Sequence, residues 1–158
     1  MTKAPDKRTD SASRVIKATA QTLYNAFLSP QAVAAWRPPD GMRCEIYTFD
    51  AKVGGGYRMS FIYRDDSRGQ GKTSANADVI KGCFAELVPG KRIVELVEFE
   101  SDGAEFAGTM KITTTFTPVT GGTKVTFICE DVPLGIKEED HAKGMTSTLE
   151  NLAAFTEE

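Results

Sequence analysis

The spacing of apolar residues changes along this chain, and that change restricts the folds it can adopt. Between residues 42 and 132, apolar residues tend to alternate with polar ones, as in a strand with one buried face. In the clearest stretch, one face holds Tyr57, Met59, Phe61 and Tyr63. Before and after this region the spacing is three or four residues, which is typical of amphipathic helices. The sequence therefore predicts an antiparallel sheet flanked by helices.

Two short helices are predicted before the sheet, with N-caps at Thr19 and Ser29. Pro30 suits the first position of the second helix. Pro38 should end that helix and push Arg37 out of the α-helical region. The single tryptophan, Trp36, ends the second helix and is expected to face inward. Residues 37–41 should then form a stiff rim, at the end of the fold that the last helix leaves uncovered.

One long helix is predicted from about Lys137 to Thr156. Its expected apolar stripe consists of Met145, Leu149, Leu152 and Phe155. A curved sheet with one apolar face needs a cover, and this helix is the only predicted element large enough. We therefore expect an α+β helix-grip fold, in which about six to seven curved antiparallel strands wrap around the C-terminal helix. The two short helices follow the first strand.

The length and composition fit a single domain. We expect residues 1–12 to be a disordered lead-in and residues 13–158 to form the domain, with a polar connection at 64–75. The formal net charge of −3 argues against a nucleic-acid partner. No apolar run is long enough to span a membrane. Three scattered cysteines give no disulfide framework, so a cytoplasmic location is expected.

Five stretches in this order give the chain a family resemblance. They are "IKATAQTLYNAFLSPQAVAAW", "GGGYRMSF", "GCFAELVPGKRIV", "TFTPVTGGTKVTF" and "KGMTSTLENLAAF". From about Ser13 to Phe155 the chain resembles the START-like (SRPBCC) superfamily, and within it a bacterial group related to the activator of the 90-kDa heat-shock-protein ATPase. The resemblance implies the helix-grip fold. It also places Met145 where a second tryptophan is usual, which should widen that end of the interior.

A helix-grip fold encloses a cavity between sheet and helix unless large side chains fill it. We predict that a small hydrophobic or amphipathic ligand binds there without catalysis. The candidate ligand-binding residues are Trp36, Tyr57, Met59, Phe61, Tyr63, Met110, Phe127, His141 and Met145. Most of these residues could equally form a solid core, and His141 could be a partly exposed residue at the start of a helix.

Few residues suggest other chemistry. His141 is the only histidine, which excludes a two-histidine metal site, and no catalytic set, metal site or cofactor is predicted. Four acidic residues lie in predicted strands whose inward face is undecided: Asp78, Glu95, Glu98 and Glu100. One or two of them could point inward and bind a ligand.

Three alternatives stay open. The superfamily also contains polyketide cyclases and aromatases, in which the shape of the cavity folds the substrate. The related group implies a co-chaperone role with a heat-shock-protein ATPase as the partner. Exposed strand edges would also allow a homodimer, although nothing in the sequence fixes an interface.

Overall fold

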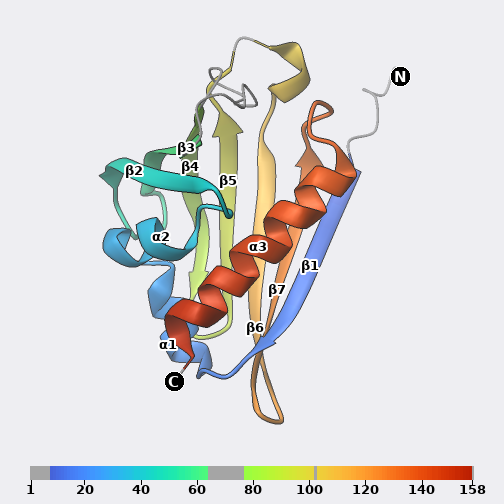
Figure 1. Cartoon of the computed structure of the whole chain (residues 1–158). Helices are drawn as coiled ribbons and strands as arrows, with labels where there is room; N and C mark the ends of the chain where they lie inside the picture. The colour runs from blue at the N-terminus through green and yellow to red at the C-terminus, as the bar shows by residue number, and fades with distance from the viewer. Residues whose placement is uncertain (1–7, 64–76, 102, 158) are drawn as a thin grey trace, which may run out of the picture.

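The computed structural model describes residues 8–63, 77–101 and 103–157. Seven antiparallel strands form one sheet in the order β1-β7-β6-β5-β4-β3-β2. The sheet curves around the last helix, α3, which crosses its concave face diagonally (Figure 1). This arrangement confirms the predicted helix-grip fold. The predicted polar connection at 64–75 lies outside the described residues.

The elements follow the predicted order. The strands are β1 (Arg8–Ile16), β2 (Met42–Phe49), β3 (Gly56–Tyr63), β4 (Ala77–Val88), β5 (Arg92–Phe99), β6 (Met110–Val119) and β7 (Gly122–Val132). The helices are α1 (Ala20–Ala26), α2 (Pro30–Trp36), the short 3-10 helix η2 (Ala104–Phe106) and α3 (Glu138–Thr156). Apart from the pairing of β1 with β7, sheet neighbours are also neighbours in sequence.

The chain enters the sheet earlier than the sequence predicts. β1 begins at Arg8 and pairs with β7 along its length, so the predicted disorder is wrong for residues 8–12. The segment is polar, but it is an edge strand with one exposed face. Its Asp10 is buried under α3, where it accepts a hydrogen bond from Arg8 and is hydrogen-bonded to His141. Residues 1–7 lie outside the described part of the chain.

The caps of the two short helices are confirmed. The side chain of Thr19 accepts a hydrogen bond from the backbone of α1, and Ser29 does the same for α2. The expected departure of Arg37 from helical geometry is wrong: its φ and ψ of −69° and −39° are helical. Its backbone N–H donates to Val33, and this bond holds one more helical residue despite the proline that follows.

The buried stripe of α3 differs from the predicted one at its end. Met145, Leu149 and Leu152 are buried, but Phe155 is 49% exposed. Thr156 is buried instead, because its hydroxyl can donate to the Leu152 carbonyl within the helix. Its position, rather than that of Phe155, continues the helical repeat toward the sheet.

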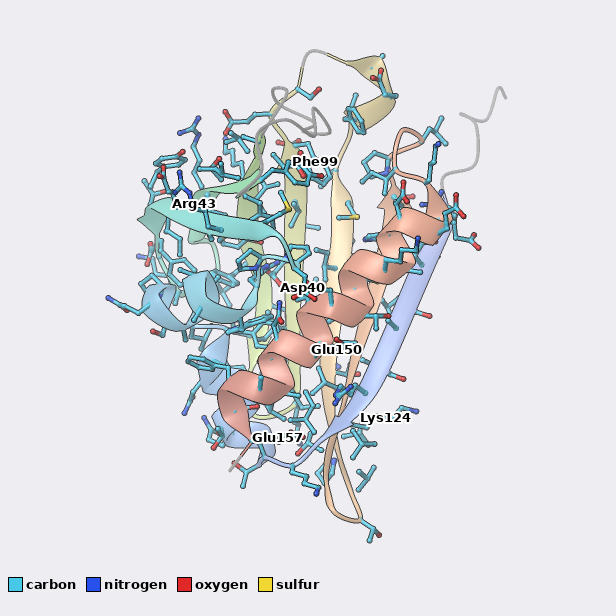
Figure 2. All side chains as sticks on the ribbon, viewed as in Figure 1. Asp40, Arg43, Phe99, Lys124, Glu150 and Glu157 are labelled. Atoms are coloured by element: carbon cyan, nitrogen blue, oxygen red, sulfur yellow. The ribbon has the colours of Figure 1, made fainter. Side chains whose placement is uncertain are left out.

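Trp36 is the anchor of the core at the α1 end. It is 1% exposed, its indole N–H donates to the Ala26 carbonyl at 2.9 Å, and its ring lies 4.6 Å from that of Phe27. One core cluster joins the inner face of the sheet to all three α-helices. Figure 2 shows side chains in the space between α3 and the sheet.

The rim at 37–41 is placed differently from the prediction. The Thr148 hydroxyl donates to the Arg37 carbonyl, and the Asn151 amide donates to the Pro38 carbonyl. The backbone N–H of Asp40 donates to Ser147, and Asp40 lies beside α3 in Figure 2. The expectation that α3 leaves this end uncovered is therefore wrong, since the middle of α3 holds the rim in place.

We predict that Trp36→Ala lowers the free energy of unfolding by about 3–5 kcal/mol, because it empties a fully buried aromatic site. Urea unfolding followed by circular dichroism measures this loss. The control is Phe155→Ala on exposed surface, where a change within about 0.5 kcal/mol is expected. Equal effects of the two substitutions would contradict the packing described above.

Candidate functional site

A charged cluster lies in the interior between the sheet and α3. It consists of Arg37, Glu95 on β5 and Tyr57 on β3, and is called the Arg37–Glu95–Tyr57 cluster below. Nη1 of Arg37 donates to Oε1 of Glu95 at 2.8 Å, and the Tyr57 hydroxyl donates to the same oxygen at 2.6 Å. Nη2 of Arg37 also donates to the Tyr57 hydroxyl at 3.3 Å. Glu95 is 1% exposed, so this is a buried ion pair.

A glycine in the middle of β4 lets Tyr57 reach Glu95. Tyr57 is paired with Gly82, and β4 separates β3 from β5. A Cβ atom at Gly82 would lie 2.3 Å from the Tyr57 ring, so the ring crosses the sheet where a side chain is missing. Glycine inside a strand often marks such a close approach.

The rim at 37–41, which α3 holds by hydrogen bonds, places Arg37 beside Glu95 and Tyr57. Its backbone is fixed by α2 on one side and by Thr148 of α3 on the other. The guanidinium carbon lies 5.4 Å from the centroid of the Tyr57 ring. Three separate parts of the chain, the end of α2, β3 and β5, therefore position the cluster.

The protonation states follow from burial and charge. Burial alone would lower the pKa of Arg37, but the charge and hydrogen bond of Glu95 outweigh burial and raise this pKa. Burial raises the pKa of the Tyr57 hydroxyl well above its ordinary value, so the hydroxyl stays protonated and can donate. Burial also raises the pKa of the Cys44 thiol to about 11 and that of the Cys129 thiol to about 12, so both are neutral at pH 7.

Two buried oxygen atoms in this region have no hydrogen-bond partner in the described structure. They are Oε2 of Glu95 and Oγ1 of Thr114 on β6. Both side chains are at most 1% exposed. Leaving a buried polar atom unpaired costs about 1–3 kcal/mol, so each such atom calls for an explanation. Buried polar atoms of this kind are ordinarily satisfied by protein groups, ordered water or a bound molecule.

The predicted ligand-binding residues separate into two groups. Those no more than 7% exposed, all part of the core, are Trp36, Tyr57, Met59, Met110, Phe127 and Met145. Those only partly buried are Phe61, Tyr63 and His141. Of the nine, Tyr57 belongs to the charged cluster. Whether any of them binds a ligand stays a prediction.

His141 takes part in a second polar cluster, between β1 and α3. Its Nδ1 lies 2.7 Å from Oδ2 of Asp10, whose other oxygen accepts from Arg8. Arg8 also donates to the Ile136 carbonyl just before α3. The hydrogen bond from Arg8, outweighing burial, together with His141 lowers the pKa of Asp10 below its usual value of 3.8. These contacts fasten the start of α3 to the edge strand.

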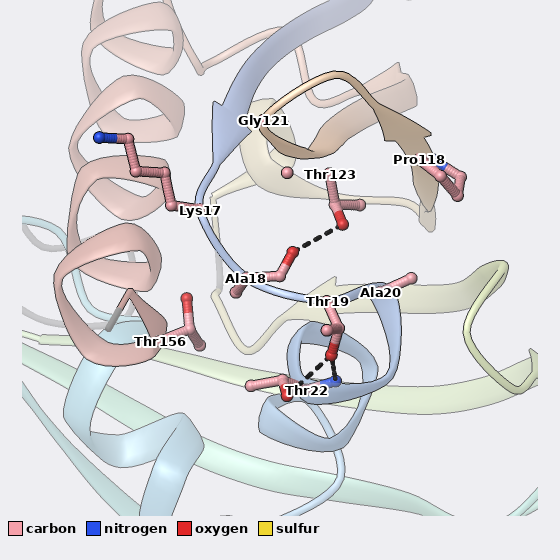
Figure 3. Close-up of a pocket in the computed structure, with 10 residues that line it drawn as sticks. Lys17, Ala18, Thr19, Ala20, Thr22, Pro118, Gly121, Thr123 and Thr156 are labelled. Carbon is pink, nitrogen blue, oxygen red and sulfur yellow. Dashed lines mark hydrogen bonds between the residues drawn. The ribbon is translucent and has the colours of Figure 1, made fainter.

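Two open hollows on the described surface lie away from the predicted site. The larger, of about 590 Å³, lies between the start of α1, the β6–β7 hairpin and the end of α3 (Figure 3). Figure 3 shows it lined mainly by small side chains, with Thr123 bonded to the Ala18 carbonyl. The smaller lies on the outer side of α3, around Thr146. None of the nine predicted residues lines either one.

The structure shows which of the four carboxylates predicted in strands face the interior. Glu95 points inward to the cluster, and Asp78 is also buried. Glu98 is exposed and accepts from Thr109, whereas Glu100 forms two hydrogen bonds with Arg58. The sequence reasoning missed Arg37 and Gly82. The glycine inside an otherwise apolar strand was the available sign of a close approach.

Two further features, a metal site and a membrane-spanning helix, can be looked for among the described residues. No group of three histidine, cysteine or acidic side chains in them could hold a metal ion. No helix within the same ranges is long and apolar enough to cross a membrane.

The curved sheet, the long helix on its concave face and the Arg37–Glu95–Tyr57 cluster between them define a helix-grip protein. The sequence model of one family, described as "Activator of Hsp90 ATPase homolog 1-like protein", matches residues 17–157. The chain therefore belongs to this family, a START/SRPBCC-type family, which confirms the resemblance in its sequence. No match is found among curated proteins.

Solved structures agree with this assignment. A protein from Chromobacterium violaceum is 33% identical, with a TM-score of 0.83 over 96% of this chain and 99% of that one. A protein from Rhodobacter sphaeroides is 18% identical, with a TM-score of 0.74 over 96% and 93% of the two chains. One from Staphylococcus epidermidis is 20% identical, with a TM-score of 0.73 over 99% and 93%. The last two similarities show the fold alone.

We predict that Arg37→Met lowers the free energy of unfolding by about 3–5 kcal/mol, since it leaves the Glu95 carboxylate buried without its cation. The double variant Arg37→Met/Glu95→Leu should recover part of that loss, because an apolar pair needs no charge compensation, although the buried Tyr57 hydroxyl is left without its two partners. Urea unfolding of the single and double variants measures both effects. A double variant as unstable as the sum of its single variants would contradict the direct pairing.

A pH dependence is expected from Asp10. Its lowered pKa means that it stabilises the fold above its unfolded-state pKa, and that this contribution disappears as the pH falls through the folded value. Asp10→Asn should therefore make stability fall less steeply below about pH 4 than in the wild type. Thermal unfolding between pH 2.5 and 7 measures the slope, with exposed Asp40→Asn as the control. An unchanged slope for Asp10→Asn would contradict this role.

Proposed function

We propose that the protein binds a small amphipathic molecule between the concave face of the sheet and α3. The Arg37–Glu95–Tyr57 cluster would hold the polar end of that molecule. The observation that supports this most directly is the unpaired Oε2 of Glu95 in a buried ion pair. A buried ion pair is stabilising only when the remaining lone pairs are satisfied, and a ligand group would satisfy this one.

A group of partly buried apolar side chains on the inner face of the sheet supports an entrance at the η2 end. Near α1 the inward-facing side chains are at most 3% exposed: Phe84, Ile93 and Phe116. Toward η2 four inward-facing side chains are only partly buried, namely Cys44, Phe61, Phe99 and Ile112, although their neighbours Ile80 and Met110 are buried. Phe99 lies at this end of the sheet in Figure 2. An apolar molecule entering here would cover these side chains and reach Glu95 behind them.

The interior has side chains that can make room. Met59, Met110 and Met145 are buried around it, and Sδ of Met59 lies 3.8 Å from Sγ of Cys44. Methionine is unbranched and flexible, so it can repack around an irregular ligand at little cost. Apolar burial would then supply affinity at about 25 cal/mol per Å².

Binding without turnover fits the arrangement of the cluster better than catalysis does. The Tyr57 hydroxyl donates to Glu95 and accepts from Arg37. Its hydrogen-bonding capacity is thus directed within the cluster rather than toward a reacting group. A cyclase or aromatase would need a proton donor as well as an acceptor aimed at the substrate, and within the cluster only Oε2 of Glu95, an acceptor, is left to face a ligand.

Purified protein should carry a co-purifying small molecule in native mass spectrometry, at one per chain. The Arg37→Met/Glu95→Leu variant should lose that mass, because it removes the polar anchor while keeping an apolar interior. The matched control is Arg58→Met/Glu100→Leu, which removes an exposed ion pair on the outer face and should keep it. Wild-type protein free of any bound molecule, or equal loss from both variants, would contradict the proposal.

The family description also suggests a chaperone partner, and the same variants separate the two roles. Binding to a chaperone would use the surface of the protein and not a carboxylate that is 1% exposed. Stimulation of a bacterial Hsp90-type ATPase by the wild type, with equal stimulation by a folded Arg37→Met/Glu95→Leu variant, would favour the co-chaperone role. Absence of stimulation together with a co-purifying molecule would favour the ligand carrier.

A further inference from the structure

We infer that the ligand presents a neutral hydroxyl group to Glu95 and Thr114, an inference that rests on the proposed function and narrows its ligand class. The hydroxyl would donate its proton to Oε2 of Glu95 and accept a hydrogen bond from Oγ1 of Thr114. A phenol or an alcohol on an apolar body has this chemistry.

The hydrogen bonds of the Glu95 carboxylate leave one oxygen atom open to a donor from the ligand. Oε1 already accepts from Arg37 and from Tyr57, at 2.8 Å and 2.6 Å. Oε2 is buried and has no partner in the described structure. An ionised carboxylate oxygen can only accept hydrogen bonds, so a group that satisfies Oε2 has to carry a proton. Ethers, ketones and thioethers lack that proton.

Thr114 supplies the second half of the site. In the register of β5 and β6, Glu95 is opposite Ile112 and Thr114 is opposite Ile93. Glu95 and Thr114 are therefore diagonal neighbours on the same face, a relation in which Cα atoms are about 7–8 Å apart and a long side chain can bridge the gap. A threonine hydroxyl both donates and accepts. A ligand hydroxyl does the same, so one group can serve both protein atoms.

The charges of the interior disfavour a charged ligand group. The carboxylate of Glu95 is already balanced by Arg37. The fully buried charged residues of the described chain are Asp10, Asp78 and Glu95, and the one cation of the cluster, Arg37, is already paired with Glu95. A ligand carboxylate would meet no unpaired cation among them and would lie beside the Glu95 oxygen. An ammonium group would add a second positive charge to a pair that is already neutral, and it could not accept a hydrogen bond from Thr114.

Three probes with the same apolar body test the class by isothermal titration calorimetry: 2-naphthol, 2-methoxynaphthalene and 2-naphthoate. The ether keeps the oxygen but loses the donated proton, and the carboxylate adds a negative charge. We expect 2-naphthol to bind about tenfold more tightly than the ether, the effect of one hydrogen bond to a charged group. 2-Naphthoate should bind more weakly than 2-naphthol.

Two substitutions test whether Glu95 and Thr114 cause the preference for 2-naphthol over the ether. Thr114→Val keeps the shape of the side chain and should reduce the affinity for 2-naphthol severalfold. It should also raise the Tm of the ligand-free protein, because it removes an unpaired buried hydroxyl. Glu95→Gln should reduce the preference for 2-naphthol over the ether to about threefold or less, because its amide loses the charge that strengthens the bond. The matched control is Thr115→Val, one residue along on the opposite face of the strand, which should change neither the preference nor the affinity.

The outcomes distinguish the two proposals. If all three probes bind with equal affinity, or if 2-naphthoate binds most tightly, the hydroxyl inference is overturned while ligand binding stands. If none binds and no molecule co-purifies, the proposed function itself is overturned and the inference with it. A lower Tm for ligand-free Thr114→Val than for the wild type would show that its hydroxyl is already satisfied, which also overturns the inference.

Discussion

The covering of the concave sheet face by α3 is the contact on which the rest of this structure depends. A seven-stranded sheet that exposes its apolar inner face to water is not stable, and α3 buries that face with a single stripe. The stripe ends in a threonine rather than in a phenylalanine, so helical spacing outweighs hydrophobicity at that position. The contacts of His141 and Arg8 with Asp10 then fasten the start of the helix to the edge of the sheet.

The same helix also positions the charged interior. Three side chains on its middle turns bond to the loop after α2, and that loop delivers Arg37 to Glu95. The Arg37 guanidinium is thereby held where burial alone would disfavour its charge. Stability and the candidate site therefore share one set of contacts. A ligand that binds at Glu95 would be bounded by the sheet on one side and by this helix and loop on the other.

The family and the fold leave the function more open than the polar groups inside the protein do. Relatives of under 25% identity share the fold, and fold alone is compatible with carriers, enzymes and co-chaperones. The interior of this chain holds the unpaired oxygen atoms of Glu95 and Thr114. In our proposal they narrow the ligand to a chemical class, which neither the family description nor the arrangement of the strands can do.

The sequence by itself determined the kinds of elements, their order and most of the inner face. Alternation at 57–63 and the caps at Thr19 and Ser29 are local patterns, and local sterics and hydrogen bonds decide them. The candidate site is different in kind. Its residues lie up to 58 positions apart in the chain, and β5 is apolar on both faces, so periodicity could not show which face carries Glu95.

Only the tertiary structure decided that Glu95 points inward, that Gly82 makes room for Tyr57, and that hydrogen bonds from α3 hold the backbone of Arg37 in place. It also decided that the polar segment from Arg8 is an edge strand rather than a tail. In each case the stabilising contact is made with another element of the fold. These contacts are the Arg37–Glu95 ion pair, the packing of the Tyr57 ring over Gly82, and the pairing of β1 with β7. Such long-range contacts leave no periodic trace in the sequence.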